Sequence, residues 1–303
     1  MRIGIDLGGT KIEIAAINDS GEIIKRARTN TPKGDYAGTL DAITELVFMV
    51  ESEFSIKATI GVAIPGTTSK KTGLIKNANS TWLIGKNLKD DLTERLNRPV
   101  KLANDANCFT LSEAADGAAS NHTVVFGVIL GTGVGGGIAI NRTILPGINS
   151  IAGEWGHNPL PWPNKSELLG EKCYCKLNGC IETYLSGPAL ASQYKLATGK
   201  SLLATEIAVL ADNGDEAAGV IMGIYENRLA RALAHLINIL DPDAIVFGGG
   251  LSNIDRLYKN VPKQWLQYIF SDSCDTVLLK HHHGDSSGVR GAAWLWGKDE
   301  LGK

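Results

Sequence analysis

The spacing of apolar residues along the chain predicts an alternation of strands and helices. Leu40, Ile43, Leu46, Val47 and Val50 recur at helical spacing, which predicts an amphipathic helix over residues 36–54. Further helices are expected over residues 89–96, 106–118, 215–240 and 288–296, and strands over residues 22–27, 58–64, 100–102, 244–247 and 276–280. This mixture predicts an α/β protein.

One local arrangement occurs twice. An apolar strand, a glycine turn and a second strand fill Arg2 to Ile17, and the same order returns between Thr123 and Asn141, roughly 125 residues later. The repetition predicts two related α/β lobes. We expect an N-terminal lobe over residues 1–118, joined by a C-terminal helix over 288–303, and a C-terminal lobe over 119–287.

Composition narrows the class of protein. The chain has 303 residues, 44% of them hydrophobic and 20% charged, with a net charge of −2. The chain has no block of like charge of the kind that binds nucleic acid or a membrane surface, and it has no apolar run long enough to span a bilayer. Five cysteines and no visible signal peptide argue against a secreted disulfide framework. We therefore expect a cytoplasmic protein.

Three strand ends carry glycine turns. Such turns expose backbone N–H groups that can hold phosphate oxygens, although any tight turn favours glycine. The occurrence of three, two of them with threonine, favours a nucleotide. The candidate residues are Gly8, Gly9, Thr10 and Lys11, then Gly131, Thr132 and Gly133, then Gly248 and Gly249. Asp6 is a candidate ligand of Mg²⁺, because hard cations prefer oxygen.

Asp105 is the candidate general base. It stands with Asn104 between a predicted strand and a predicted helix. Asp and Asn commonly cap helices at such junctions, so one residue can cap while the other faces a substrate. A carboxylate within reach of an alcohol could take its proton during phosphoryl transfer.

One histidine and three clustered cysteines form a candidate metal site. His157, Cys173, Cys175 and Cys180 are a full tetrahedral set for structural zinc. A disulfide is the alternative, but Cys173 and Cys175 are too near in sequence for a relaxed bridge. Four protein ligands leave no open position for a catalytic water, which argues against a zinc hydrolase.

Together these motifs resemble the ROK family of sugar kinases and repressors. The resemblance rests on DLGGTK from Asp6, NDANC, LGTGVGGG, GEWGH, the cysteine stretch up to Glu182, and DPDAIVFGGG. It implies a two-lobed actin/hexokinase-like (ribonuclease H-like) ATPase fold with a zinc-binding segment, using ATP, Mg²⁺ and structural Zn²⁺. It also implies Asp105 as the catalytic base, ATP phosphates on the first two glycine turns, adenosine near Gly248 and Gly249, and sugar contacts from Asn104, Glu154, His157 and Glu182. Lys176 departs from the family, which usually has glycine after the second cysteine.

The choice of sugar rests on two stretches. KNANSTWL, in which Asn79 is the candidate contact, and GEWGHNPLPW resemble the fructokinase (mannofructokinase) branch. We therefore expect phosphorylation of fructose, with mannose as a further candidate, at the 6-hydroxyl. An N-acetylglucosamine kinase stays open as the alternative, since that branch shares nearly every motif. A sugar-sensing regulator is a third reading. The resemblance also implies a homodimer. Its binding partners would be two small molecules, a hexose and ATP, with no nucleic acid and no membrane.

Overall fold

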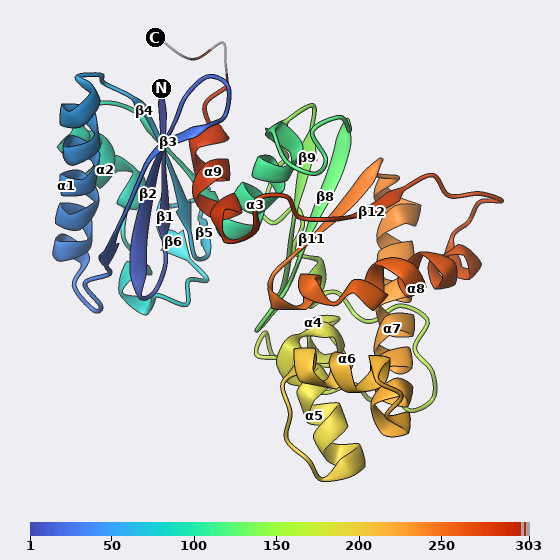
Figure 1. Ribbon diagram of the computed structural model, residues 1–303. Coiled ribbons are helices and arrows are strands. Elements are labelled where there is room, and N and C mark those ends of the chain that lie inside the picture. The colour runs from blue at the N-terminus through green and yellow to red at the C-terminus, as the bar shows by residue number, and fades with distance from the viewer. Residues whose placement is uncertain (298–299, 301–303) are drawn as a thin grey trace. The chain divides into compact units, whose positions relative to one another are not determined.

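The computed structural model describes residues 1–297 and 300, and at Asp285 only the backbone. The chain divides into two units (Figure 1). Unit 1 contains Met1–Ser120, Gly137–Ala152 and His283–Lys303, and unit 2 contains Asn121–Gly136 and Gly153–His282. The segment Gly137–Ala152, which the sequence analysis assigned to the second lobe, thus groups with unit 1. Residues 298, 299 and 301–303 of the expected C-terminal helix lie outside the described residues.

Unit 1 is built on a five-stranded sheet in the order β3-β2-β1-β4-β7. Strands β1, β2 and β3 pair antiparallel, whereas β4 lies parallel to both β1 and β7. The strands are β1 (Arg2–Leu7), β2 (Lys11–Ile17), β3 (Ile23–Asn30), β4 (Thr59–Ile64) and β7 (Val100–Asn104), with a small separate pair β5 (Thr67–Thr68) and β6 (Ile75–Lys76). The central strand β1 buries Ile3 and Ile5 completely, because helices cover both faces of the sheet.

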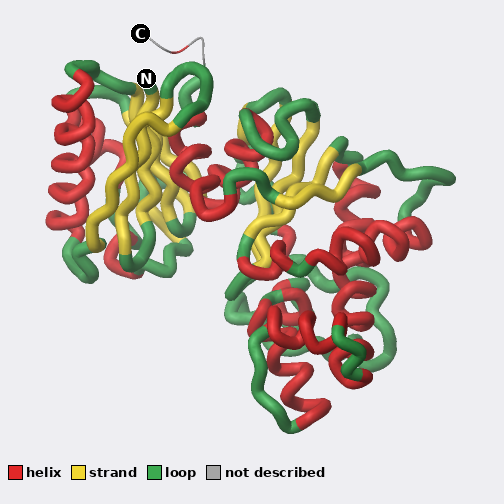
Figure 2. Tube along the Cα trace, viewed as in Figure 1, coloured by secondary structure: helices red, strands yellow, loops and turns green. Residues whose placement is uncertain are grey.

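The helices of unit 1 flank this sheet on two sides (Figure 2). They are α1 (Tyr36–Phe54), α2 (Leu88–Leu96), α3 (Asp105–Ala115) and α9 (Ser287–Trp294), with short 3-10 turns η1 (Thr81–Leu83) and η5 (Gly284–Ser286). Helix α1 packs on β2, whereas α9 packs on β1, β4 and α3. Glycine is required where α9 approaches β1 and α3 closely. A Cβ atom at Gly4 would lie 1.9 Å from the carbonyl oxygen of Val289, and one at Gly291 would lie 1.7 Å from that of Cys108.

A second sheet has the same plan as the first. Its order is β10-β9-β8-β11-β12, and β11 is parallel to β8 and to β12. The strands are β8 (Val124–Leu130), β9 (Val134–Ile140), β10 (Thr143–Ile144), β11 (Ala244–Gly248) and β12 (Val277–Lys280). Each sheet thus begins with hairpin-connected strands and continues with parallel ones. This is the repeated α/β architecture that the two glycine turns predict.

The helices of unit 2 assemble around α7 (Glu216–Leu240), which packs against α4, α5, α6 and α8. Those helices are α4 (Glu182–Leu185), α5 (Gly187–Thr198), α6 (Ala204–Asp212) and α8 (Asp255–Trp265), with 3-10 turns η2 (Trp155–His157), η3 (Gly250–Asn253) and η4 (Leu266–Tyr268). Helix α7 is capped at its start by Asp215 and ends at Asp241, whose φ of 47° is left-handed. None of the described helices combines the length and apolar character needed to cross a membrane.

Candidate functional site

The glycine turn of unit 1 is a closed β-hairpin turn. Between β1 and β2, the N–H of Gly8 donates to the carbonyl of Lys11 at 3.0 Å. Thr31, just beyond β3, makes two hydrogen bonds to this turn. Its N–H donates to the carbonyl of Thr10 at 3.0 Å, and its hydroxyl donates to the carbonyl of Gly8 at 2.8 Å. The turn is therefore fixed before any ligand arrives.

Beside this turn lies a hollow of about 420 Å³, which we call the Asp105 hollow. Five of the residues selected from the sequence line it, although they come from three separate parts of the chain: Asp6, Gly8, Gly9, Asn79 and Asp105. Thr10 and Lys11 belong to the same turn without lining the hollow. Unit 1 thus brings the candidate base, the candidate Mg²⁺ ligand, one phosphate turn and one candidate sugar contact together.

At the junction of β7 and α3, two adjacent polar residues have different positions. Asn104 is the N-cap of α3, and its side-chain oxygen accepts from the N–H groups of Ala106 at 2.8 Å and Asn107 at 3.3 Å. Asp105 is the first helical residue and lines the Asp105 hollow. Asn104 lines a different hollow of unit 1, of about 550 Å³. Asn104 therefore caps the helix, while its neighbour Asp105 lines the Asp105 hollow.

The two carboxylates of the Asp105 hollow have unusual electrostatics. Burial, and then the nearby charges of Asp105 and Glu13, raise the pKa of Asp6 to about 6. Desolvation by the surrounding protein also raises the pKa of Asp105, against the opposing effect of the Ala106 N–H, which donates to its carboxylate at 2.8 Å. A carboxylate with a raised pKa is a better proton acceptor, and a pair of carboxylates favours a cation between them.

Lys33 also lines the Asp105 hollow, and the sequence analysis missed it. It stands in a tight turn in which the N–H of Asp35 donates to the carbonyl of Pro32 at 3.2 Å and Gly34 has a φ of 78°. Asp35 then caps α1 by accepting from the N–H of Gly38 at 2.9 Å. The Pro-Lys-Gly-Asp stretch is a recognisable turn signal, but its position beside the glycine turn depends on Thr31.

The second glycine turn connects β8 and β9 in unit 2. The N–H of Gly131 donates to the carbonyl of Gly133 at 3.0 Å, and Thr132 is exposed. Glu182 lies against this turn, because its carboxylate accepts from the N–H of Val134 at 2.9 Å. A Cβ atom at Gly133 would lie 2.6 Å from that carboxylate. The turn and the predicted sugar contact Glu182 are therefore neighbours.

The third glycine run lies beside the second turn. Gly248 ends β11, and Gly249 follows with a φ of 80°. A Cβ atom at Gly249 would lie 2.4 Å from the carbonyl oxygen of Leu130, the last residue of β8. Glycine is required here by both the dihedral angle and the close approach. Two of the three glycine runs thus lie next to each other, at the carboxyl ends of β8 and β11.

The GEWGH stretch is pinned to β9. The indole N–H of Trp155 donates to the carbonyl of Gly135 at 2.8 Å, and its ring packs edge-on against Phe126. A Cβ atom at Gly156 would lie 2.1 Å from the carbonyl oxygen of Val134. These contacts fix the flanking residues Glu154, which is exposed, and His157.

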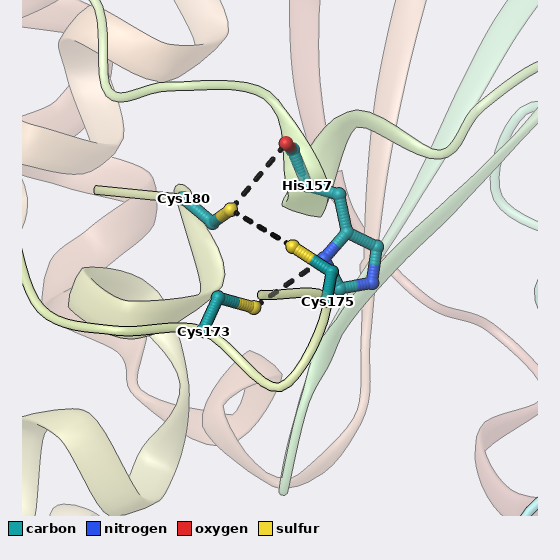
Figure 3. Close-up of side chains that lie close together, drawn as sticks. All are labelled: His157, Cys173, Cys175 and Cys180. Carbon is teal, nitrogen blue, oxygen red and sulfur yellow. Dashed lines mark hydrogen bonds between the residues drawn. The ribbon is translucent and has the colours of Figure 1, made fainter. Parts of the chain in front are cut away.

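His157, Cys173, Cys175 and Cys180 gather into one group, the His–Cys cluster (Figure 3). Their ligand atoms all lie within 4.8 Å of one another, and the cysteines are free thiols. The Sγ atoms of Cys175 and Cys180 are 3.5 Å apart, and Cys173 Sγ is 3.6 Å from His157 Nδ1. Zinc bonds of about 2.0–2.3 Å in a tetrahedron require ligand separations of about 3.5–3.8 Å. The donor set and its spacing both fit structural zinc.

The loop that carries the cysteines keeps the family's turn despite Lys176. This residue has a φ of 76°, the left-handed conformation that glycine adopts freely. The turn is closed by the N–H of Lys176 donating to the carbonyl of Cys173 at 2.9 Å. The N–H of Leu177 lowers the pKa of Cys175, which favours the thiolate that a metal requires. The lysine therefore strains the loop without displacing a ligand.

A buried ion cluster anchors the chain between His157 and the cysteines. Glu167 is 4% exposed and accepts from Arg228 at 2.7 Å and from Arg231 at 3.0 Å, both on α7. Arg231 also donates to the carbonyls of Pro161 and Trp162. The loop before the cysteines is thus tied to the longest helix of unit 2.

Comparison with known proteins identifies the family. The chain matches the ROK family over residues 2–299 and belongs to it. It is 39% identical to the N-acetyl-D-glucosamine kinase of Salmonella paratyphi B over 300 residues, covering 97% of this chain and 99% of that protein. It is also 39% identical to the N-acetyl-D-glucosamine kinase of Histophilus somni over 302 residues, covering 98% and 99%.

Solved structures show the same two-domain fold. The ROK hexokinase of Thermus thermophilus superposes with a TM-score of 0.85 at 27% identity, covering 97% of both chains. The ROK glucokinase of Streptomyces griseus, in complex with glucose and AMPPNP, gives a TM-score of 0.75 at 28% identity, covering 96% of this chain and 97% of that one. The expected actin/hexokinase-like fold is confirmed.

The expectation of fructose as the substrate is contradicted by these comparisons. Curated relatives that match nearly the whole chain are N-acetyl-D-glucosamine kinases and not fructokinases. The expectation rested chiefly on the KNANSTWL stretch, which brings Asn79, Ser80 and Trp82 to the Asp105 hollow. Amide, hydroxyl and indole groups can hydrogen-bond or stack on many sugars, so these side chains alone do not select one.

Proposed function

We propose that this protein is an ATP-dependent kinase that phosphorylates N-acetylglucosamine at its 6-hydroxyl. The chemistry is supported by one observation above all, the Asp105 hollow, in which a carboxylate of raised pKa lies beside a fixed glycine turn and a second carboxylate. The choice of sugar is supported by the 39% identity to N-acetyl-D-glucosamine kinases over nearly the full chain.

Asp105 is the general base in this proposal. Its carboxylate holds the sugar 6-hydroxyl and accepts its proton as the oxygen attacks the γ-phosphorus of ATP. The new O–P bond forms while the bond from the γ-phosphorus to the bridging oxygen breaks, and ADP leaves with that electron pair. The raised pKa of Asp105 makes its carboxylate a stronger proton acceptor than an ordinary aspartate.

Positive charge and N–H donors steady the transferred group. Gly8 and Gly9, and Gly131 to Gly133, are the predicted phosphate contacts in this proposal. Among the described residues that line the Asp105 hollow, Lys33 carries the positive charge, and we place it on the transferred phosphoryl. Asp6 would hold Mg²⁺, which supplies charge neutralisation to the triphosphate when bound.

The His–Cys cluster has a structural part in the proposal. His157, Cys173, Cys175 and Cys180 would hold zinc, whose four protein ligands leave no position for substrate. The ion would fix Glu182, two residues beyond Cys180, and Glu154, three residues before His157. We retain Glu154, His157, Glu182, Asn79 and Asn104 as predicted sugar contacts, Gly248 and Gly249 as predicted adenosine contacts, and the homodimer as a prediction.

A coupled ADP-release assay over four sugars tests the proposal. We expect kcat/KM for N-acetylglucosamine to exceed that for fructose, mannose and glucose by at least about tenfold, or ~1.4 kcal/mol. Preference for another hexose would refute the choice of sugar and leave the kinase chemistry standing. No turnover of any of the four would refute the kinase.

A further inference from the structure

Tyr174, between the first two cysteine ligands, is bound to His157. Its hydroxyl lies 2.8 Å from His157 Nε2, and the two rings meet edge-on with centroids 5.0 Å apart at 87°. The other ring nitrogen, Nδ1, faces Cys173 (Figure 3). An imidazole that binds a metal through Nδ1 carries its proton on Nε2, so with zinc in the His–Cys cluster His157 would donate to the oxygen of Tyr174.

This hydrogen bond occupies the one N–H that His157 could offer to a sugar. The phenol oxygen accepts from His157 and keeps its own O–H, which is a donor. The donor available to a sugar is therefore the phenol O–H of Tyr174 instead of the imidazole N–H of His157, and it lies further from the His–Cys cluster.

The surroundings of Tyr174 belong to the proposed sugar site. The negative charges of Glu182 and Glu154 lie near the Tyr174 side chain. Glu182 and Glu154 are two of the predicted sugar contacts. A structural alternative is that Tyr174 only packs the cysteine loop. However, its side chain is 78% exposed, so packing gains little from it.

We propose that Tyr174 is a substrate-binding residue, whose hydroxyl donates to a sugar hydroxyl while accepting from His157. The proposal rests on the kinase function above and revises it at one residue: the sugar contact predicted for His157 is made instead by Tyr174, which the family resemblance left without a role. The exposed ring also offers a face to the C–H groups of a pyranose, which suits an aromatic side chain with a polar tip.

The test compares Tyr174→Phe with Leu177→Ala. Phenylalanine keeps the ring and removes the hydroxyl, and Leu177 is a matched control because it lies in the same loop and is 64% exposed. For Tyr174→Phe we expect the KM for the sugar to rise about tenfold, with kcat within about threefold and the KM for ATP unchanged. Zinc content and melting temperature should equal those of the unsubstituted protein, and Leu177→Ala should leave the KM unchanged.

Three results would overturn this assignment. The first is a sugar KM for Tyr174→Phe within twofold of the unsubstituted protein. The second is an equal rise in KM for Leu177→Ala, and the third is a loss of zinc from Tyr174→Phe; either of these two would make Tyr174 a support of the loop. The sugar used is the one that the unsubstituted protein phosphorylates best. If it phosphorylates none, the proposed function fails separately, and calorimetric binding of N-acetylglucosamine to both proteins decides the role of Tyr174 in the same way.

Discussion

Replacement of Asp105 by asparagine is the perturbation that isolates proton transfer. Asparagine has the same size and keeps a side-chain oxygen for the Ala106 N–H, which Asp105 accepts at 2.8 Å. The helix cap is supplied by Asn104 and is untouched. The variant should therefore fold normally and bind sugar, and should lose only the ability to accept the proton.

The expected loss follows from the role of a general base. Such groups contribute about 10²- to 10⁴-fold, so kcat should fall by that factor, which is about 3–5.5 kcal/mol of activation free energy. The assay is coupled ADP release, with sugar binding followed by calorimetry. Asp215→Asn is the matched control, because Asp215 caps α7 by accepting from the Ala218 N–H at 2.8 Å and asparagine caps equally well. A kcat for Asp105→Asn within tenfold of the unsubstituted protein would refute the assignment of the base.

Four further predictions concern other residues of the two units. Lys33→Ala should lower kcat about 100-fold, whereas Lys57→Ala, at an exposed lysine of the same unit, should not, as steady-state kinetics would show. Glu167→Gln leaves two arginines without their buried partner and should lower the free energy of unfolding by about 3–5 kcal/mol in urea denaturation; a change below 1 kcal/mol would contradict this. Because the pKa of Asp6 is raised to about 6, kcat/KM should fall as the pH drops through 6. The folded protein binds this proton more tightly than the unfolded chain does, so the proton's contribution to stability should be lost as the pH rises through 6. Removal of metal from the His–Cys cluster should lower the melting temperature and raise the KM for sugar, and full activity in a protein shown to be zinc-free would contradict its proposed part.

Local signals in the sequence were sufficient for several elements. Helix α1 begins and ends at the residues expected, since Asp35 caps its start and the apolar spacing persists to Phe54. In the glycine-rich stretch LGTGVGGG, by contrast, part of the apparent turn is strand, because β9 already begins at Val134. Glycine at positions 135–137 carries no side chain to show strand alternation, and the pairing that makes this segment a strand is long-range.

The residues missed by sequence reasoning act through contacts that no local pattern contains. Lys33 reaches the Asp105 hollow because Thr31 binds the carbonyls of a turn more than twenty positions earlier in the chain. Tyr174 resembles any aromatic residue between two cysteines until its hydroxyl is seen on His157. The choice of sugar was wrong for a related reason. It depended on the shape of a pocket, which side-chain identities in one loop do not specify.

The most direct test of the account is to identify the product. Purified protein incubated with N-acetylglucosamine, MgATP and no other sugar should yield ADP and a phosphate ester in equal amounts, and ³¹P-coupled NMR should place the ester on the carbon that bears the 6-hydroxyl. ADP formed without a sugar phosphate, or an ester at another position, would contradict the placement of Asp105 beside the attacking alcohol.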